Sequence, residues 1–100
     1  PPGDGKRDNV VSKKVIVGNV SGLHLRPTGL LCNEAIKYQS SVKFISTGRS
    51  GPATTNAKSV LSVLGACVKC GDEIEFICEG PDEEEALAAV IRLVESGLGE

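Results

Sequence analysis

The apolar face of the C-terminal segment constrains the fold more than any other feature of this sequence. Apolar residues recur at the i, i+3, i+4, i+7 spacing of an amphipathic helix, at Leu87, Val90, Ile91, Val94 and Leu98. Asp82 and Glu85 predict a capping box at the start of this helix, and Gly97 predicts its end. A helix with one apolar face packs against another layer, which the preceding segments must supply.

Strand patterns supply that layer in four places. They are expected at residues 14–20, around Val42 and Phe44, at residues 53–56, and around Ile74, Phe76 and Cys78. Two further helical patterns run from Leu25 to Tyr38 and from Val60 to Leu64. The order is βαββαβα, which predicts an α+β open-faced sandwich, a four-stranded antiparallel sheet with three helices on one face.

Size and composition indicate one small domain. The chain has 100 residues; we assign residues 11–100 to the domain and residues 1–10 to a flexible leader or a cloning remnant. Aromatic residues make up only 3% and neither Met nor Trp is present, so Val, Leu, Ile and Ala must build the core.

Charge and hydropathy argue against several classes of protein. A net charge of −2 without a run of Lys or Arg argues against nucleic-acid binding. No apolar stretch approaches the ~18–20 residues of a membrane span, and no signal peptide is visible. We therefore expect a reduced, cytoplasmic setting and a monomer.

The one histidine of the chain lies between the first predicted strand and the first predicted helix, in Gly22-Leu23-His24-Leu25-Arg26-Pro27. The imidazole of His24 and the guanidinium of Arg26 are thus expected at the opening turn of a helix. Unpaired N–H groups and the positive end of the helix dipole favour an anion there, such as a phosphoryl group. The alternative is that His24 merely caps the helix and that Arg26 is a solvated surface charge.

Four segments in this order resemble the HPr family, the histidine-containing phosphocarrier proteins of bacterial phosphotransferase systems. Besides the hexad around His24, they are Lys58-Ser59-Val60-Leu61, Gly71-Asp72-Glu73-Ile74 and residues 80–87. The last segment is similar to the nitrogen-related branch of the family. The resemblance covers about residues 13–100, and it implies the open-faced sandwich and a covalent relay rather than an autonomous enzyme.

The resemblance also implies a chemistry for the hexad. His24 would accept a phosphoryl group on Nδ1 from phospho-Enzyme I and pass it to an EIIA-type acceptor, in the sugar or the nitrogen branch. Neutral imidazole suits this step because it is nucleophilic and has a pKa near neutrality. Arg26 would stabilise the charge of the phosphoryl group. No metal or other cofactor is implied.

Two further groups of residues are candidates by the same resemblance. Ser59 corresponds to a serine that an HPr kinase phosphorylates in many Gram-positive HPr proteins; alternatively, Ser59 or Asn56 simply caps the second helix. An exposed apolar patch for docking Enzyme I and acceptor domains is expected from Leu25, Thr28, Val60, Leu61 and Leu64. The alternative for Val60, Leu61 and Leu64 is that they all belong to the core.

Three positions depart from the family pattern. At two positions the residue differs: Leu25 stands where a small residue is usual, and Ser62 stands where sugar-system members often have Gly. The third departure is the length of the hairpin from Thr47 to Thr54, which is longer than usual. Leu25 and Ser62 leave a second hypothesis open, an HPr-like regulatory module that docks partners without phosphoryl turnover.

The spacing Cys67-Val68-Lys69-Cys70 is a C-x-x-C motif. A structural zinc site would need two more ligands, but Cys78 falls on the core face of its strand and Cys32 falls within the first helix. A thioredoxin-like motif opens a helix after a strand, whereas this one follows a helix and precedes a strand. We therefore expect ordinary reduced thiols, with a thiol-based metal or redox module as the third hypothesis.

Overall fold

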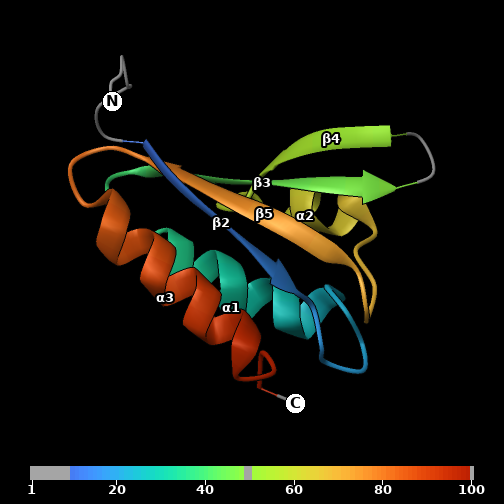
Figure 1. Cartoon of the computed structure of the whole chain (residues 1–100). Coiled ribbons are helices and arrows are strands. Elements are labelled where there is room, and N and C mark those ends of the chain that lie inside the picture. Colours follow the sequence, from blue (N-terminus) through green and yellow to red (C-terminus); the bar gives the residue numbers. More distant parts are fainter. Residues whose placement is uncertain (1–9, 49–50, 100) are drawn as a thin grey trace.

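The computed structural model describes residues 10–48 and 51–99 (Figure 1). Seven elements follow one another in the predicted βαββαβα order: β2 (Val10–Ile16), α1 (Leu25–Ala35), β3 (Ser41–Gly48), β4 (Gly51–Asn56), α2 (Val60–Ala66), β5 (Glu73–Glu79) and α3 (Glu83–Glu95). Seven residues of β2 pair with seven residues of β5, although the two strands lie at opposite ends of the domain sequence.

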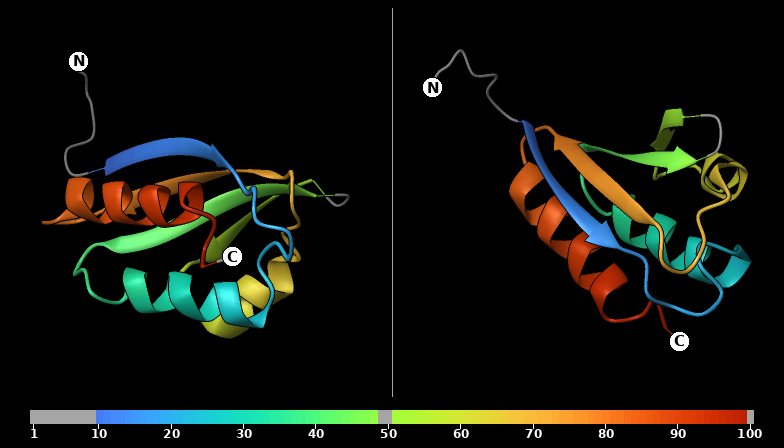
Figure 2. Two further views of the ribbon diagram at one scale, coloured as in Figure 1. Left: turned by 90° about the horizontal axis from the view of Figure 1, so that it is seen from below. Right: turned by 45° about the vertical axis from the view of Figure 1, so that its right-hand side comes forward.

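The four strands form one antiparallel sheet in the order β2-β5-β3-β4. Figure 2 shows that the three helices cover one face of this sheet and leave the other face without a helix. The predicted open-faced sandwich is therefore confirmed. In this order the first strand, β2, lies beside the last strand, β5, which separates it from β3.

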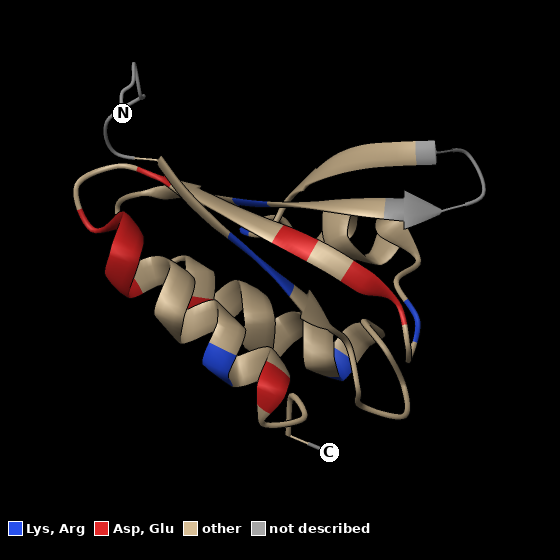
Figure 3. Ribbon diagram, in the orientation of Figure 1, with Lys and Arg blue, Asp and Glu red and all other residues tan. Residues whose placement is uncertain are grey.

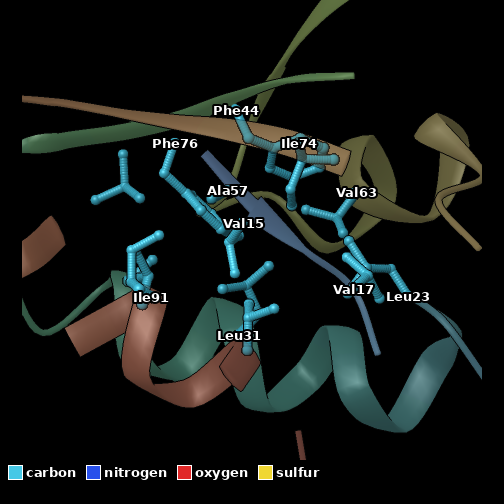
Figure 4. Packing of buried hydrophobic residues seen from close by; sticks show 14 of the residues in the cluster. Val15, Val17, Leu23, Leu31, Phe44, Ala57, Val63, Ile74, Phe76 and Ile91 are labelled. Atoms are coloured by element: carbon cyan, nitrogen blue, oxygen red, sulfur yellow. The ribbon is translucent and has the colours of Figure 1, made fainter. Parts of the chain in front are cut away.

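The core lies between the sheet and the helices, and aliphatic side chains dominate it, as the composition predicted (Figure 4). Phe44 and Phe76 face each other across β3 and β5, with ring centroids 5.6 Å apart in an edge-to-face arrangement. Ile74, Phe76 and Cys78 of β5 are buried, which confirms the alternation read from the sequence.

The first strand differs from the prediction. It spans Val10–Ile16 rather than residues 14–20, because the partner strand β5 offers a pairing position to each residue from Val10 to Ile16. Beyond it, the Val17 N–H donates to the Asp72 carbonyl oxygen at 2.9 Å and the chain enters a loop. Of the predicted leader, residues 1–9 lie outside the described residues, and Val10 pairs with Glu79 in the sheet.

The C-terminal end of α3 confirms the predicted glycine stop. The Gly97 N–H donates to the Val94 carbonyl oxygen and the Leu98 N–H donates to the Leu93 carbonyl oxygen, both at 3.1 Å. These paired bonds are a Schellman motif, in which Gly97 takes the left-handed conformation at φ +95°.

The predicted capping box at the start of α3 is wrong. The Asp82 side chain makes no hydrogen bond to its own helix. Its oxygens instead accept hydrogen bonds from the backbone N–H groups of Gln39 (3.0 Å) and Ser40 (2.9 Å) and from the Ser40 hydroxyl. Asp82 therefore joins the turn before β3 to the turn before α3, a contact that no local pattern can signal.

Candidate functional site

His24 lies at the N-cap position of α1, with an extended backbone (φ −81°, ψ −172°). Its carbonyl oxygen accepts the Thr28 N–H at 2.8 Å, which starts the helix. The imidazole is exposed and makes no capping hydrogen bond to the helix. The alternative that the His24 side chain caps α1 is therefore wrong.

The residue before His24 anchors the site in the core. Leu23 is buried at the end of the core that also holds Val17 and Val63 (Figure 4). Its N–H donates to the Val68 carbonyl oxygen at 2.9 Å, in the loop that leads to β5. His24 therefore directly follows a residue that core packing and a backbone hydrogen bond hold in place.

Gly22 brings the two loops into this contact. Its φ is +65°, a left-handed conformation that favours glycine, and a Cβ at this position would lie 2.6 Å from the Val68 carbonyl oxygen. A larger residue would therefore push the segment before His24 away from residues 68–70. Glycine at position 22 of the hexad is thus explained by steric constraints, which the sequence alone did not reveal.

Two buried side chains hold the carbonyl groups just before His24. The Asn19 amide nitrogen donates to the Gly22 carbonyl oxygen at 2.8 Å, and the Thr28 hydroxyl donates to the Leu23 carbonyl oxygen at 3.0 Å. The prediction that Thr28 lies in an exposed docking patch is therefore wrong, because its hydroxyl faces inward to the backbone and its side chain is fully buried. Sequence reasoning missed Asn19, whose only signal was a short polar residue in a glycine-bounded turn.

The first turn of α1 can receive an anion next to His24. The N–H groups of the first helical residues, Leu25 and Arg26, have no acceptor within the helix, and Pro27 has no N–H to satisfy. Arg26 is exposed at the same end of the helix. Donors, helix dipole and guanidinium thus combine into a region that favours negative charge.

An open hollow of about 300 Å³ lies beside the histidine. Residues from the start of α1, the end of α2 and the loop before β5 line it: Leu23, His24, Leu25, Leu64, Cys67, Val68 and Lys69. The fold therefore brings His24 together with Leu25 and Leu64 of the predicted patch, and also with Cys67 and Lys69, which lie more than 40 residues further along the chain.

The remaining residues of the predicted patch differ in exposure. Leu25 is 69% exposed and Leu61 is 82% exposed, Val60 is exposed to a lesser extent, and Leu64 is partly buried. These side chains form apolar surface at the start of α1 and along α2. Their part in docking remains a prediction.

Ser59 is the N-cap of α2, and its hydroxyl oxygen accepts the Ser62 N–H at 3.3 Å. The Asn56 side-chain oxygen accepts the Lys58 N–H at 3.0 Å one turn earlier. The capping role of Ser59 is thus confirmed, while its phosphorylation remains a prediction.

The cysteines fall into two pairs. Cys78 is buried, as predicted, and Cys32 is buried as well. Burial raises the pKa of both thiols, that of Cys78 to about 11 with a further contribution from the Glu83 carboxylate. Cys67 and Cys70 are exposed. Within residues 10–48 and 51–99, no three Cys, His or acidic side chains are grouped so that they could hold a metal ion. In the same residues no helix has the length and apolar character needed to cross a bilayer.

A family model described as "PTS HPr component phosphorylation site" matches residues 11–96. The chain belongs to the HPr family. The phosphocarrier protein HPr of Treponema pallidum is 35% identical over 91 residues, which cover 91% of this chain and 99% of that protein. A multiphosphoryl transfer protein of Vibrio cholerae is 38% identical over 84 residues, which cover 84% of this chain but only 21% of that longer protein.

Solved structures agree with this assignment. HPr from Thermoanaerobacter tengcongensis superposes with a TM-score of 0.81 at 32% identity, covering 90% of this chain and 97% of that one. HPr from Bacillus anthracis gives a TM-score of 0.76 at 32% identity, covering 83% and 94%. This HPr-family protein is accordingly a phosphocarrier of a phosphotransferase system, and the resemblance read from four segments of the sequence is confirmed.

Proposed function

We propose that this phosphocarrier takes a phosphoryl group from Enzyme I onto His24 and passes it to an EIIA-type acceptor. The observation that carries the proposal is the exposed imidazole of the one histidine, held at the N-terminus of α1. In the first step an imidazole nitrogen, Nδ1 by the family resemblance, attacks phosphorus while the bond to the donor breaks. The second step repeats this displacement with the acceptor as nucleophile and His24 as leaving group.

The surrounding groups serve charge stabilisation. The N–H groups of Leu25 and Arg26 donate to phosphoryl oxygens, and the Arg26 guanidinium adds a positive charge that the exposed side chain can bring over the site. Since positioning and charge stabilisation dominate phosphoryl transfer, the carrier needs neither a metal nor another cofactor of its own.

Partner binding is proposed on the exposed apolar surface of Leu25, Val60, Leu61 and Leu64. An Enzyme I and an EIIA-type domain would each cover this surface in turn, with the protein acting as a cytoplasmic monomer. Phosphorylation of Ser59 by an HPr kinase would add negative charge at the start of α2, beside this surface, and weaken coupling to Enzyme I.

The first test is phosphoenolpyruvate with a bacterial Enzyme I, read by intact mass. We expect one acid-labile phosphoryl group on the wild type and none on His24→Ala. Arg26→Gln is the matched control, since it keeps the nucleophile: it should still be phosphorylated on His24, about tenfold more slowly because one charge-assisted contact is lost.

A natively folded protein that several Enzyme I homologues fail to phosphorylate would contradict the proposal. Such a result would instead support the docking module without phosphoryl turnover.

A further inference from the structure

Lys69 contributes a positive charge to the surroundings of His24 from the loop before β5. Of the described residues that line the hollow beside His24, Lys69 is the one cation and none is acidic. Figure 3 shows basic positions in this loop and in the first turn of α1, where Arg26 lies. The fold thus places a cation on two different elements around the histidine.

The backbone of Lys69 is held against the segment that carries His24. A Cβ at Gly22 would lie 2.8 Å from the Lys69 Cα, so the two chain segments touch at this point. The neighbouring Val68 carbonyl oxygen accepts the Leu23 N–H at 2.9 Å. Lys69 therefore starts from a fixed place beside the residues that directly precede His24.

The ammonium group of Lys69 is available, although its backbone is engaged. The Lys69 N–H donates to an Asp72 carboxylate oxygen at 2.9 Å, and the Asp72 N–H donates to the Lys69 carbonyl oxygen at 3.0 Å. Within residues 10–48 and 51–99 the one ion pair joins Lys37 and Glu34. The flexible four-carbon stem of Lys69 can therefore direct its charge to a new anion.

We infer that Lys69 is a second cation of the phosphoryl site, whose ammonium binds phosphoryl oxygens when His24 carries the group. The inference rests on the proposed function, since it concerns the phosphorylated state of His24. Arg26 approaches this group from α1 and Lys69 approaches it from the loop before β5. A phosphoryl group offers three acceptor oxygens, so both cations can form charge-assisted hydrogen bonds with it.

A cation at this distance leaves a measurable signature in the phosphorylated protein. A positive charge favours the more negative form of a nearby group, so Lys69 lowers the apparent pKa of the phosphohistidine. This effect is electrostatic and weakens as salt screens the charges. A purely structural role of Lys69 would change neither the apparent pKa nor its dependence on salt.

Three variants and a small-molecule phosphoryl donor test the inference. Lys69→Gln removes the charge, Lys69→Arg keeps it, and both leave the backbone hydrogen bonds with Asp72 in place. Lys14→Gln is the matched control, because Val15 is buried in the core and the adjacent Lys14 therefore faces the side of the sheet without helices. Phosphoramidate transfers its phosphoryl group to the imidazole of His24 and releases ammonia, so no Enzyme I is needed.

Phosphorus NMR of each phosphorylated protein, followed across neutral pH, gives the apparent pKa. We expect Lys69→Gln to raise it by about 0.5, roughly a threefold change in proton affinity. Lys69→Arg and Lys14→Gln should titrate within about 0.1 of the wild type. In about 1 M salt the difference between Lys69→Gln and the wild type should largely disappear.

An apparent pKa of Lys69→Gln equal to that of the wild type would overturn the inference, as would an equal rise in Lys14→Gln. A folded protein that phosphoramidate leaves unmodified would overturn it as well, since no phosphoryl group would then be held at His24. If phosphoramidate modifies His24 but no Enzyme I does, the proposed function fails, and the titrations still decide the role of Lys69.

Discussion

His24 takes its position from side chains that lie behind it in the fold. Asn19 and Thr28 donate hydrogen bonds to the carbonyl groups of two consecutive residues, Gly22 and Leu23, and both side chains are buried. A backbone held at two successive carbonyls has little freedom to turn, so the imidazole and the N–H groups of α1 keep a fixed relation. Phosphoryl transfer depends on such positioning.

At this scale we predict the effect of Thr28→Val, which has nearly the same shape but no hydroxyl. The buried Leu23 carbonyl loses its side-chain donor, so the free energy of unfolding should fall by about 1–3 kcal/mol. The rate of His24 phosphorylation should fall about three- to tenfold at saturating Enzyme I, because the site is less well positioned. Urea denaturation and initial rates measure the two effects.

Thr28→Ser is the matched control for the hydroxyl. It keeps the donor to Leu23 and loses only a methyl group, so its phosphorylation rate should remain close to that of the wild type. If the serine and valine variants lose the same activity, the hydroxyl does not position His24.

At the scale of the elements, the turn before α3 contains Asp82, whose carboxylate binds a distant turn and not its own helix. Asp82 receives hydrogen bonds from Gln39 and Ser40, more than 40 residues away along the chain. The hydrogen bond from the Ser40 hydroxyl, and then that from the Gln39 N–H, lower the pKa of Asp82 below its ordinary value. This carboxylate thus links β3 and α3 through their preceding turns.

This link predicts an acid-dependent loss of stability. Because the pKa of Asp82 is lower in the folded state than in the unfolded chain, its contribution is present above the unfolded value, about pH 4, and is lost as the pH falls through the folded value. Asp82→Asn should be less stable than the wild type at pH 7, and the difference should shrink below about pH 4. Urea denaturation from pH 2 to pH 7 measures it.

Glu84→Gln is the control, since Glu84 is an exposed acid in the first turn of the same helix. For Asp82→Asn we expect a stability difference from the wild type that vanishes in acid. For Glu84→Gln we expect only a minor change of this kind. A constant difference across this pH range for Asp82→Asn would exclude the ionised link.

The packing of the whole molecule determines which thiols are exposed to solvent. Cys78 lies between Ile77 and Glu79 in β5, and it is fully buried because β5 lies inside the sheet and α3 covers that face. Cys32 faces inward from α1 in the same core. The layered fold thus removes two of the four cysteines from solution.

We therefore predict a thiol count that depends on folding. Ellman's reagent should react promptly with two thiols of the native protein, those of Cys67 and Cys70, and with four in guanidinium chloride. Cys67→Ser should lower both counts by one. Prompt reaction of a third thiol in the native state would mean that the core opens at Cys32 or Cys78.

Local patterns in the sequence determined much of this protein. Alternation along β5 and the apolar face of α3 depend only on the 2.0 and 3.6 residue periods of the backbone, and both predictions are confirmed. The place of His24 between a strand and a helix is likewise a local property, as is the glycine stop at Gly97.

Only the tertiary structure decided which distant residues meet. Thr28 turned out to be buried, Asp82 to serve a turn 42 residues away, and Cys67 to share a hollow with His24. In each case the partner is set by how the layers pack, and packing brings together residues that no periodicity relates. The chain thus encodes its elements and its phosphorylation motif locally, while the support of that motif and the thiol beside it arise only when the sheet and helices assemble.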